Sequence, residues 1–306
     1  GTDNTIVGGL AGDALTTGAL NVAIGKAALS AEDTGSANVA IGHAALMSQN
    51  YDGSAYNTAV GHNAGTAVTT GVQNTLMGAI AGDSLTTGTN NVAIGFEALA
   101  TEDEHSFNVA VGHRALKTQN AGASAYNTAL GYNAGLSVTT GVENTLIGGL
   151  AGDALTTGSL NTALGYNALS AEDAHGGNTA IGNSALMVLN AGADGYNTTV
   201  GWSAGKGMST GVQNTAVGAL ALDDTVTGNF NVAVGMSAGS AVTSGHSNTI
   251  IGSQAGDAIT TGDNNIIIGK DAAASAVGVD NETVIGTTAT TSALVHGLKQ
   301  PVIAAS

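Results

Sequence analysis

The stretch NVAIGKAALSAEDTGSANVAIG, residues 21–42, contains one motif twice and decides how the whole chain folds. The motif is a pentad, Asn-(Thr/Val/Ile)-X-(Val/Ile/Leu/Met)-Gly, and its two copies here begin at Asn21 and Asn38. Sixteen copies cover the chain, and a looser seventeenth with one inserted residue runs from Asn281 to Gly286. Self-similarity at a short fixed period is the signature of a solenoid. The sixteen copies begin at Asn4, Asn21, Asn38, Asn57, Asn74, Asn91, Asn108, Asn127, Asn144, Asn161, Asn178, Asn197, Asn214, Asn231, Asn248 and Asn265.

The spacing of the pentads has a longer period of its own. In the first three groups of four steps from one pentad to the next, three steps have the same length and the third is longer by two positions, as from Asn38 to Asn57. The last group, from Asn214, lacks this insertion. The sequence therefore predicts a 70-residue super-repeat of four coils, in which Asn4, Asn74 and Asn144 are equivalent. The extra positions of the longer coils fall in three loops, at 47–56, 117–126 and 187–196.

Each pentad reads as a short strand that ends at a corner. Its second and fourth residues share one strand face and its third lies on the other, and we expect both faces to be buried. The closing glycine, as at Gly25 and Gly42, is typical of a corner that needs positive φ or close backbone approach. Ala28 and Ala45, three residues later, indicate a crowded site. Thr-Thr-Gly marks a second turn in many coils, so we expect two short strands and two turns per coil.

A coil of this length cannot bury its own apolar face, but stacked coils can. The sequence therefore predicts an all-β parallel β-solenoid of about 17 coils of 17–19 residues, spanning roughly 80 Å at the usual strand spacing. Frequent glycine and β-branched residues argue against helix. We expect the pentad asparagines to form a hydrogen-bonded ladder along the axis, as in other in-register stacks. Its expected members include Asn21, Asn38, Asn57, Asn74, Asn91 and Asn108.

Composition limits the partners of such a solenoid. The 306 residues include 47 Gly, one Pro and no Cys, and the formal net charge is −16. This charge argues against nucleic acid or an anionic membrane surface as a partner. No apolar run is long enough to span a membrane, so we expect no membrane insertion.

The small apolar third residues of the pentads also bear on assembly. They lie opposite the Val and Ile residues, and a solenoid alone in water should carry polar groups on its outer side. We therefore expect something to cover the alanine face, and self-association is the simplest way to cover it.

Asn-Val-Ala-Ile-Gly at 21–25 and 91–95 resembles the head repeat of trimeric autotransporter adhesins, the YadA-like head, whose usual form is Asn-Ser-Val-Ala-Ile-Gly. Asn-Thr-Ala-Val-Gly-His-Asn-Ala-Gly at 57–65 and Asn-Thr-Ala-Leu-Gly-Tyr-Asn-Ala-Gly at 127–135 are closer to arrays in phage tail fibres and in surface proteins of marine bacteria. The resemblance covers residues 4–286. The 17-residue coil is longer than the autotransporter repeat, which favours a phage fibre or another secreted filament.

This resemblance implies a left-handed β-roll, packed side by side as a homotrimer, that serves as a rigid stalk or a host-binding surface. The expected location is a virion tail fibre or the extracellular surface. The implied partners are other copies of the chain, other fibre or virion proteins, and a host surface receptor or glycan. A bacterial surface adhesin or filament subunit is the alternative.

Tyrosines in the longer coils are the candidate contact residues. Tyr56, Tyr126 and Tyr196 end the three loops, and Tyr51 lies within the first. Loops on a rigid scaffold are where binding sites arise, so these residues could touch a receptor or a glycan. The other interpretation is that each tyrosine packs at a corner of its coil.

Carboxylates recur in register as well, among them Asp13, Asp83 and Asp153. Stacked carboxylates could bind Ca²⁺ between coils. However, the glycine- and aspartate-rich calcium nonapeptide is missing, and Asp after Gly at a turn is an ordinary solvated residue. No other cofactor and no zinc spacing is indicated.

We expect no enzymatic activity, because the sequence has neither a nucleophile elbow nor a phosphate-binding loop. A polysaccharide-degrading spike with acid pairs between subunits is the enzymatic alternative. An ice-binding solenoid is a third, but its Thr-Thr-Gly array is interrupted, as at Glu32 and Asp33. The array is expected to occupy residues 1–286, and residues 287–306 are expected to form a cap or a link to a neighbouring module.

Overall fold

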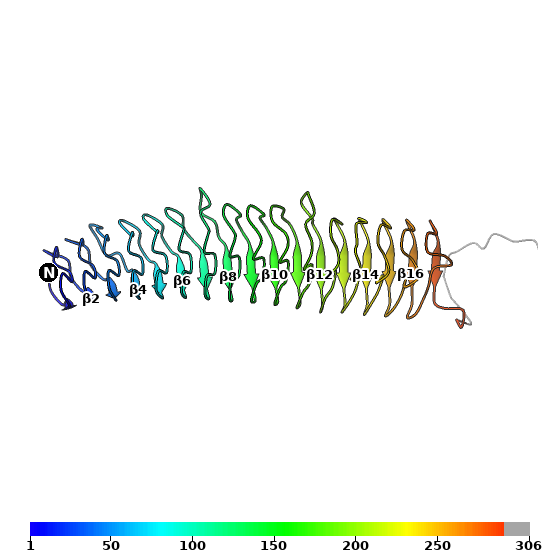
Figure 1. Ribbon diagram of the computed structural model, residues 1–306, viewed down its shortest axis with the longest axis horizontal. Helices are drawn as coiled ribbons and strands as arrows, with labels where there is room; N and C mark the ends of the chain where they lie inside the picture. The colour runs from blue at the N-terminus through cyan, green and yellow to red at the C-terminus, as the bar shows by residue number, and fades with distance from the viewer. Residues whose placement is uncertain (291–306) are drawn as a thin grey trace, which may run out of the picture.

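The computed structural model describes residues 1–290, which form a parallel β-solenoid whose coils follow one another along one axis (Figure 1). These residues contain seventeen three-residue strands in one sheet and no helix. The expectation of an all-β solenoid of about 17 coils is confirmed. The strands are β1 (Thr5–Val7), β2 (Val22–Ile24), β3 (Val39–Ile41), β4 (Thr58–Val60), β5 (Thr75–Met77), β6 (Val92–Ile94), β7 (Val109–Val111), β8 (Thr128–Leu130), β9 (Thr145–Ile147), β10 (Thr162–Leu164), β11 (Thr179–Ile181), β12 (Thr198–Val200), β13 (Thr215–Val217), β14 (Val232–Val234), β15 (Thr249–Ile251), β16 (Ile266–Ile268) and β17 (Thr283–Ile285).

Consecutive strands pair in register, so each pentad lies directly on the next. Ala23 of β2 pairs with Ala40 of β3, and Ala40 pairs in turn with Ala59 of β4 although a longer coil connects them. The extra positions are therefore accommodated in the loop and not in the sheet. Asn74 and Asn91, which precede β5 and β6, lie on adjacent coils.

Each described coil has one strand, not the two that the sequence suggested. The rest of the coil is a series of turns, with left-handed backbone at residues such as Leu29 (φ 52°) and Leu46 (φ 48°). This conformation prevents an extended strand on the second side. Backbone hydrogen bonds still join the coils there: the Leu29 amide donates to the carbonyl of Ala45, with N and O 3.0 Å apart.

The pentad asparagines form a buried column that ties each coil to both neighbours. The backbone N–H of Asn144 donates to the side-chain Oδ1 of Asn127 (2.8 Å). In turn, the side-chain Oδ1 of Asn144 accepts from the backbone N–H of Asn161 (3.0 Å). Nδ2 of Asn144 donates to the carbonyl of Gly158 at the far turn (2.9 Å). One side chain thus closes its own coil and holds the next in register. Asn21, Asn38, Asn57, Asn74, Asn91 and Asn108 are all buried in this column.

The glycine that ends each pentad occupies a corner that no other residue fits. Gly25 has φ 134°, and a Cβ built on it would collide with the carbonyl group of Gly42 in the next coil. Both the conformation and the contact exclude a side chain. Ala28 and Ala45 lie just beyond these corners and are fully buried.

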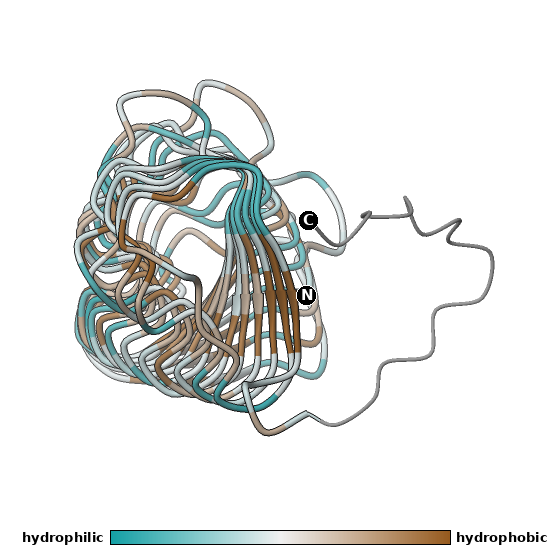
Figure 2. Ribbon diagram, turned by 90° about the vertical axis from the view of Figure 1, so that its right-hand side faces the viewer, coloured by the Kyte–Doolittle hydropathy of each residue, from teal (hydrophilic) through white to brown (hydrophobic). Residues whose placement is uncertain are grey.

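One face of the sheet is buried and the other is partly exposed, although the sequence predicted that both would be buried. Ala23 and Ala40, at the third pentad position, are fully buried and point into the solenoid, while Val22 and Ile24 lie partly exposed on the outside. The expectation that the alanine face needs covering is therefore wrong, because that face is the interior. In β2 and β3 the outward residues are the larger apolar ones, Val and Ile. Figure 2 shows the strands as a band of hydrophobic residues along the solenoid.

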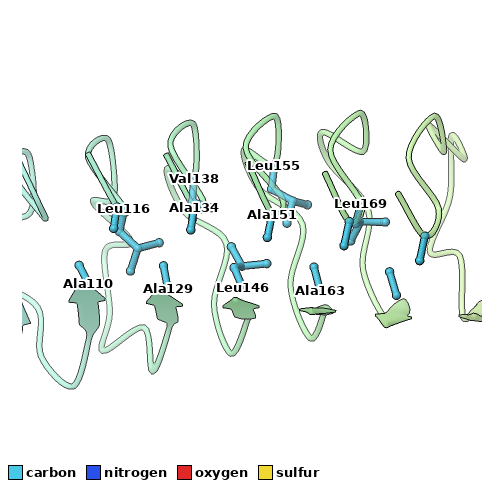
Figure 3. Packing of buried hydrophobic residues seen from close by; sticks show 14 of the residues in the cluster. Ala110, Leu116, Ala129, Ala134, Val138, Leu146, Ala151, Leu155, Ala163 and Leu169 are labelled. Atoms are coloured by element: carbon cyan, nitrogen blue, oxygen red, sulfur yellow. The ribbon is translucent and has the colours of Figure 1, made fainter. Parts of the chain in front are cut away.

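The interior is filled by side chains that compensate one another in size (Figure 3). In the coil of β5, Leu76 fills the space beside Gly82, where an added Cβ would lie 2.8 Å from Leu76 Cδ2. In the coil of β6 the sizes are exchanged: Ala93 is on the strand and Leu99 stands at the position of Gly82. In these two coils a large residue at one position is matched by a small residue at the other, as a closely packed interior requires.

Only the start of the expected C-terminal cap is within the described residues. After β17, residues 287–290 form a turn in which the Thr287 amide donates to Oγ1 of Thr290 (2.9 Å). The rest of that segment, 291–306, lies outside the described residues.

Candidate functional site

The outer face of the sheet is an apolar surface that runs the length of the solenoid. The second and fourth residues of each pentad form two rows on it: the fourth-residue row is Val, Ile, Leu or Met throughout, and the second-residue row is Thr in eleven of the seventeen strands and Val or Ile in the rest. Leu130 is 46% exposed and Leu164 is 42% exposed. Contiguous apolar surface of this extent on a soluble protein is typical of an interaction site.

All ten aromatic residues of the chain are exposed, and none lies in the core. Aromatic side chains bury much of their surface in most folds, so their exclusion from this interior points to a role on the surface. Nine of the ten lie in two columns that flank the strands. The post-glycine column consists of the residues that follow each pentad glycine, and its aromatic members are Phe96, Tyr132, Tyr166 and Trp202. The pre-asparagine column consists of the residues before each pentad asparagine, and its aromatic members are Tyr56, Phe107, Tyr126, Tyr196 and Phe230.

Rings on adjacent coils stack within these columns. Phe96 and His113 have ring centroids 5.4 Å apart, and His113 and Tyr132 have theirs 5.3 Å apart. In the pre-asparagine column, Phe107 and Tyr126 stack at 5.1 Å with nearly parallel planes. Parallel stacking of coils thus converts equivalent positions of successive repeats into continuous aromatic surface.

The candidate loop tyrosines lie at the surface. Tyr56, Tyr126 and Tyr196 are 62%, 56% and 57% exposed, and their left-handed backbone, with φ between 46° and 52°, carries the chain back toward the strand. Tyr51 is 37% exposed. The structure therefore places these rings where a partner could reach them and does not pack them into the coil.

The loops themselves project from the solenoid, and Figure 1 shows taller loops before β8 and before β12. Nothing lies within 4 Å of a Cβ built on Gly122 or Gly192 at their tips.

A buried glutamate anchors two of the three loops, 47–56 and 187–196, from the coil before each. Oε2 of Glu172 accepts from the backbone amide of Ala191 in the following loop (3.2 Å), and Oε2 of Glu32 accepts from that of Tyr51 (3.3 Å). Oε1 of Glu32 accepts from Gly35 in its own turn (2.7 Å). These fully buried carboxylates connect the solenoid to its loops.

Glu172 and the equivalent Glu102 each form a cluster with a histidine, which the sequence analysis missed. Nδ1 of His105 lies 2.7 Å from Oε1 of Glu102, and Nδ1 of His175 lies 3.1 Å from Oε1 of Glu172. Comparison at the 70-residue offset hides these pairs, whereas the Glu-X-X-His spacing within one turn reveals them. Burial raises the pKa of Glu102 above its ordinary value of 4.5, and the hydrogen bonds from His105 oppose that shift.

Each cluster offers a set of atoms that could hold a divalent cation. Glu102, Asp103 and His105 place one ligand atom each within 4.8 Å of one another, and Glu172, Asp173 and His175 do the same. The expected calcium residues Asp13, Asp83 and Asp153 are not brought together, because they lie four coils apart. Burial raises the pKa of Asp83 and of Asp153 above 3.8, so each behaves as a partly buried turn residue.

The first threonine of the Thr-Thr-Gly turns is used within the fold. Oγ1 of Thr139 donates to the carbonyl of Thr156 (3.1 Å), and Oγ1 of Thr156 donates to that of Asp173 (2.7 Å). These hydroxyls therefore join coils and do not form a free hydroxyl array. Within residues 1–290, no helix is long and apolar enough to cross a bilayer.

Fold and surface together define an all-β solenoid repeat protein with an apolar sheet face, two exposed aromatic columns and projecting loops. Comparison with known proteins adds no family to this description, since no family model and no curated protein matches the sequence.

Proposed function

We propose that this chain is a structural segment of an attachment fibre and not an enzyme, most simply the shaft or receptor-binding part of a phage tail fibre. It acts through rigidity, length and repeated display of surface groups. On this proposal the segment works on a virion or in the extracellular space. The other partners are further fibre or virion proteins and a receptor or glycan on the host surface.

The observation that carries this proposal is the exposure of every aromatic residue beside a continuous apolar sheet face. A solenoid that served only as a spacer would gain nothing from these rings in water. The 70-residue super-repeat would display one projecting loop every four coils, about 19 Å apart. Regular display on a rigid rod suits multivalent attachment, in which several weak contacts combine into strong binding.

The same proposal includes self-association as a side-by-side homotrimer of left-handed rolls. The surface that other copies would cover is the outer sheet face, with Leu130 and Leu164 among its exposed residues. Seventeen coils at about 4.8 Å give this face a length near 80 Å. That length offers ample area for a stable interface, which needs about 800 Å² per partner.

Native mass measurement tests the assembly. The full chain is expected at three times its 29.5 kDa mass. Leu130→Lys with Leu164→Lys is expected to give the monomer, because two unpaired charges would be buried in the interface. Ala123→Lys, at an exposed loop position, is the matched control and should leave the assembly intact. A wild-type chain that stays monomeric at all concentrations would contradict the trimer.

Attachment is tested with the labelled full chain on a panel of Gram-negative and Gram-positive bacteria. Retention on some cells and not on others is the expected result. Equal, salt-sensitive retention on every cell type would show unspecific adhesion and contradict the proposal.

A bacterial surface adhesin or filament subunit is the second candidate, since the same exposed surface would serve it. End-to-end filaments of the purified chain in electron micrographs would favour this candidate over a tail fibre.

A further inference from the structure

The post-glycine column places aromatic rings on every second coil over part of its length. Its aromatic members Phe96, Tyr132, Tyr166 and Trp202 follow β6, β8, β10 and β12. The coils between them carry His113, Gly149 and Asn183 at the same position.

Backbone hydrogen bonds fix the alignment of this column. The amide of Asn133 donates to the carbonyl of His113 (2.9 Å), that of Ser184 to Tyr166 (2.9 Å), and that of Ser203 to Asn183 (2.9 Å). This bond recurs from coil to coil, so equivalent positions of successive coils lie next to one another along the solenoid.

The aromatic rings are therefore spaced by two coils, or about 9.6 Å. The measured ring centroids agree, because His113 lies 5.4 Å from Phe96 on one side and 5.3 Å from Tyr132 on the other. The ring planes are inclined to each other by 27° and 17°, and the centroids lie at distances typical of offset stacking, so neighbouring rings do not cover each other fully. Part of each ring face is then uncovered.

Farther along, the ring faces have fewer neighbours. Gly149 has no side chain, and Asn183 is small and exposed. Tyr166 is 52% exposed and Trp202 is 57% exposed. A row of exposed rings that recurs on every second coil is suited to a ligand that is itself long and periodic.

Extended β-1,4-linked polysaccharides have this form. A pyranose with equatorial substituents presents its axial C–H groups as an apolar face, which packs on an aromatic ring. Successive units are turned by half a rotation, so every second sugar presents the same face, and the length of two units is close to two coils. We propose that the post-glycine column binds an uncharged β-1,4-linked polysaccharide of glucose or N-acetylglucosamine, laid parallel to the solenoid axis, an inference that rests on the proposed attachment function.

The negative charge of the protein further limits which polysaccharides could bind. The net charge of −16 disfavours anionic polysaccharides by long-range repulsion. The column's own cations, Lys26 and Lys270, lie four coils away from Phe96 and from Trp202. Arg114 and Lys117, in the aromatic part of the solenoid, both pair with Glu97 at 2.8 Å and 2.7 Å. An uncharged chain approaches without this cost.

Calorimetric titration of the full-length chain with soluble oligosaccharides tests the proposal. Cellohexaose represents the glucose polymer and chitohexaose the N-acetylglucosamine polymer. The two are measured separately, and at least one of them is expected to bind. Maltohexaose, whose α-linked chain curves, and polygalacturonate, which is anionic, are expected to bind at least tenfold more weakly.

Substitutions locate the site. Tyr166→Ala and Trp202→Ala are each expected to weaken binding by roughly tenfold, as the loss of one aromatic contact. Tyr132→Ala combined with both should abolish binding. Tyr56→Ala and Phe230→Ala, in the pre-asparagine column, are the matched controls and should bind like the wild type, with unchanged melting temperatures for all variants.

A register variant separates ring spacing from ring number. Tyr166→Asn combined with Asn183→Tyr keeps the composition but moves one ring by a single coil. Binding should fall to the level of Tyr166→Ala. Wild-type affinity in this variant, or in the triple alanine variant, would overturn the proposal.

Two further outcomes would also overturn it. If the triple variant changes the native mass, the column belongs to the interface between copies of the chain. If the wild type is retained on cells but binds neither cellohexaose nor chitohexaose, this inference fails while the proposed attachment function stands. Oligosaccharide binding without retention on any cell would instead count against the proposed function and leave the polysaccharide site in place.

Discussion

At the scale of single residues, backbone contacts between coils leave the pentad glycines no freedom to change. Gly95 has φ 136°, and a Cβ on it would lie only 2.6 Å from the carbonyl carbon of Gly112 and closer still to its oxygen. Gly122, in a projecting loop, has φ 71° and open space around it. A side chain at Gly95 would meet both a steric clash and an unfavourable φ, whereas one at Gly122 would meet only the unfavourable φ. Comparing the two glycines therefore isolates the effect of the clash.

Gly95→Ala is expected to lower the free energy of unfolding by more than about 3 kcal/mol, because the backbone of two coils must move apart. Gly122→Ala should cost only about 1 kcal/mol, for the left-handed conformation alone. Urea denaturation followed by circular dichroism measures both. Equal losses would show that the corner contact does not matter.

The buried glutamates make stability depend on pH. Burial raises the pKa of Glu102 above 4.5, so the unfolded chain gives up this proton at a lower pH than the folded chain does. The contribution of Glu102 is then most favourable below pH 4.5 and is lost as pH rises through its raised folded pKa. In the Glu102→Gln variant, the free energy of unfolding should therefore decrease less than in the wild type as the pH rises above 4.5.

Glu97 is the control with the opposite sign. Hydrogen bonds from Lys117, then from Arg114, hold its pKa below 4.5, so its contribution is present above that pH and is lost as pH falls. Glu97→Gln should weaken the protein at neutral pH and leave it unchanged in acid. Thermal melts at a series of pH values distinguish the two variants, and parallel profiles would contradict both assignments.

Residue spacing predicted which residues repeat but not all of their contacts. The asparagine column could be predicted because asparagine is the first residue of all sixteen pentads. The pairing of His105 with Glu102 did not, because it depends on the path of a single turn. Exposure of Tyr56 was equally undecided, since a corner tyrosine can point inward or outward without changing the repeat.

At the scale of the strand, alternation of side chains defines two faces but not which of them is inside. The pentads have apolar residues on both faces, so the pattern of Ala23 between Val22 and Ile24 fits either orientation. The interior settles the question, because a large residue on one side of a coil needs a small one across from it. In the coil of β6 the small Ala93 leaves room for Leu99. In the coil of β5 it is Gly82 that leaves room for Leu76 on the strand.

Leu146 and Leu164, on adjacent strands, test this orientation. Leu146 is fully buried, so Leu146→Ala should cost about 2–5 kcal/mol in unfolding free energy through the cavity it leaves. Leu164 points outward, and Leu164→Ala should remove at most about 1 kcal/mol from an isolated chain. Its effect is expected in the association constant instead, measured by sedimentation. A larger stability loss for Leu164→Ala would reverse the assignment of faces.

At the scale of the whole molecule, each coil contacts only its neighbours. Stability is then a sum of local terms, and whole blocks can be removed without disturbing the rest. Residue counting predicts where the cuts belong, because Asn74 and Asn144 begin equivalent coils of successive super-repeats.

Deletion of residues 74–143 should give a folded solenoid about 19 Å shorter. Small-angle scattering measures the length. Deletion of residues 74–135, which joins the coils out of register, should unfold the segment around the junction. Equal stability of the two deletions would argue against coil-by-coil independence.

The direction of the hydrogen bonds determines how this rod responds to force. The strands lie across the axis and their hydrogen bonds run along it, as between β8 and β9 (Figure 1). If the two ends of the chain are pulled apart, the hydrogen bonds between one pair of adjacent coils can break before those of the next pair are disturbed. A single chain pulled lengthwise would peel from its ends, releasing slack in steps of one coil. The solenoid would resist compression along its axis, and under tension it would lengthen by unfolding one coil after another.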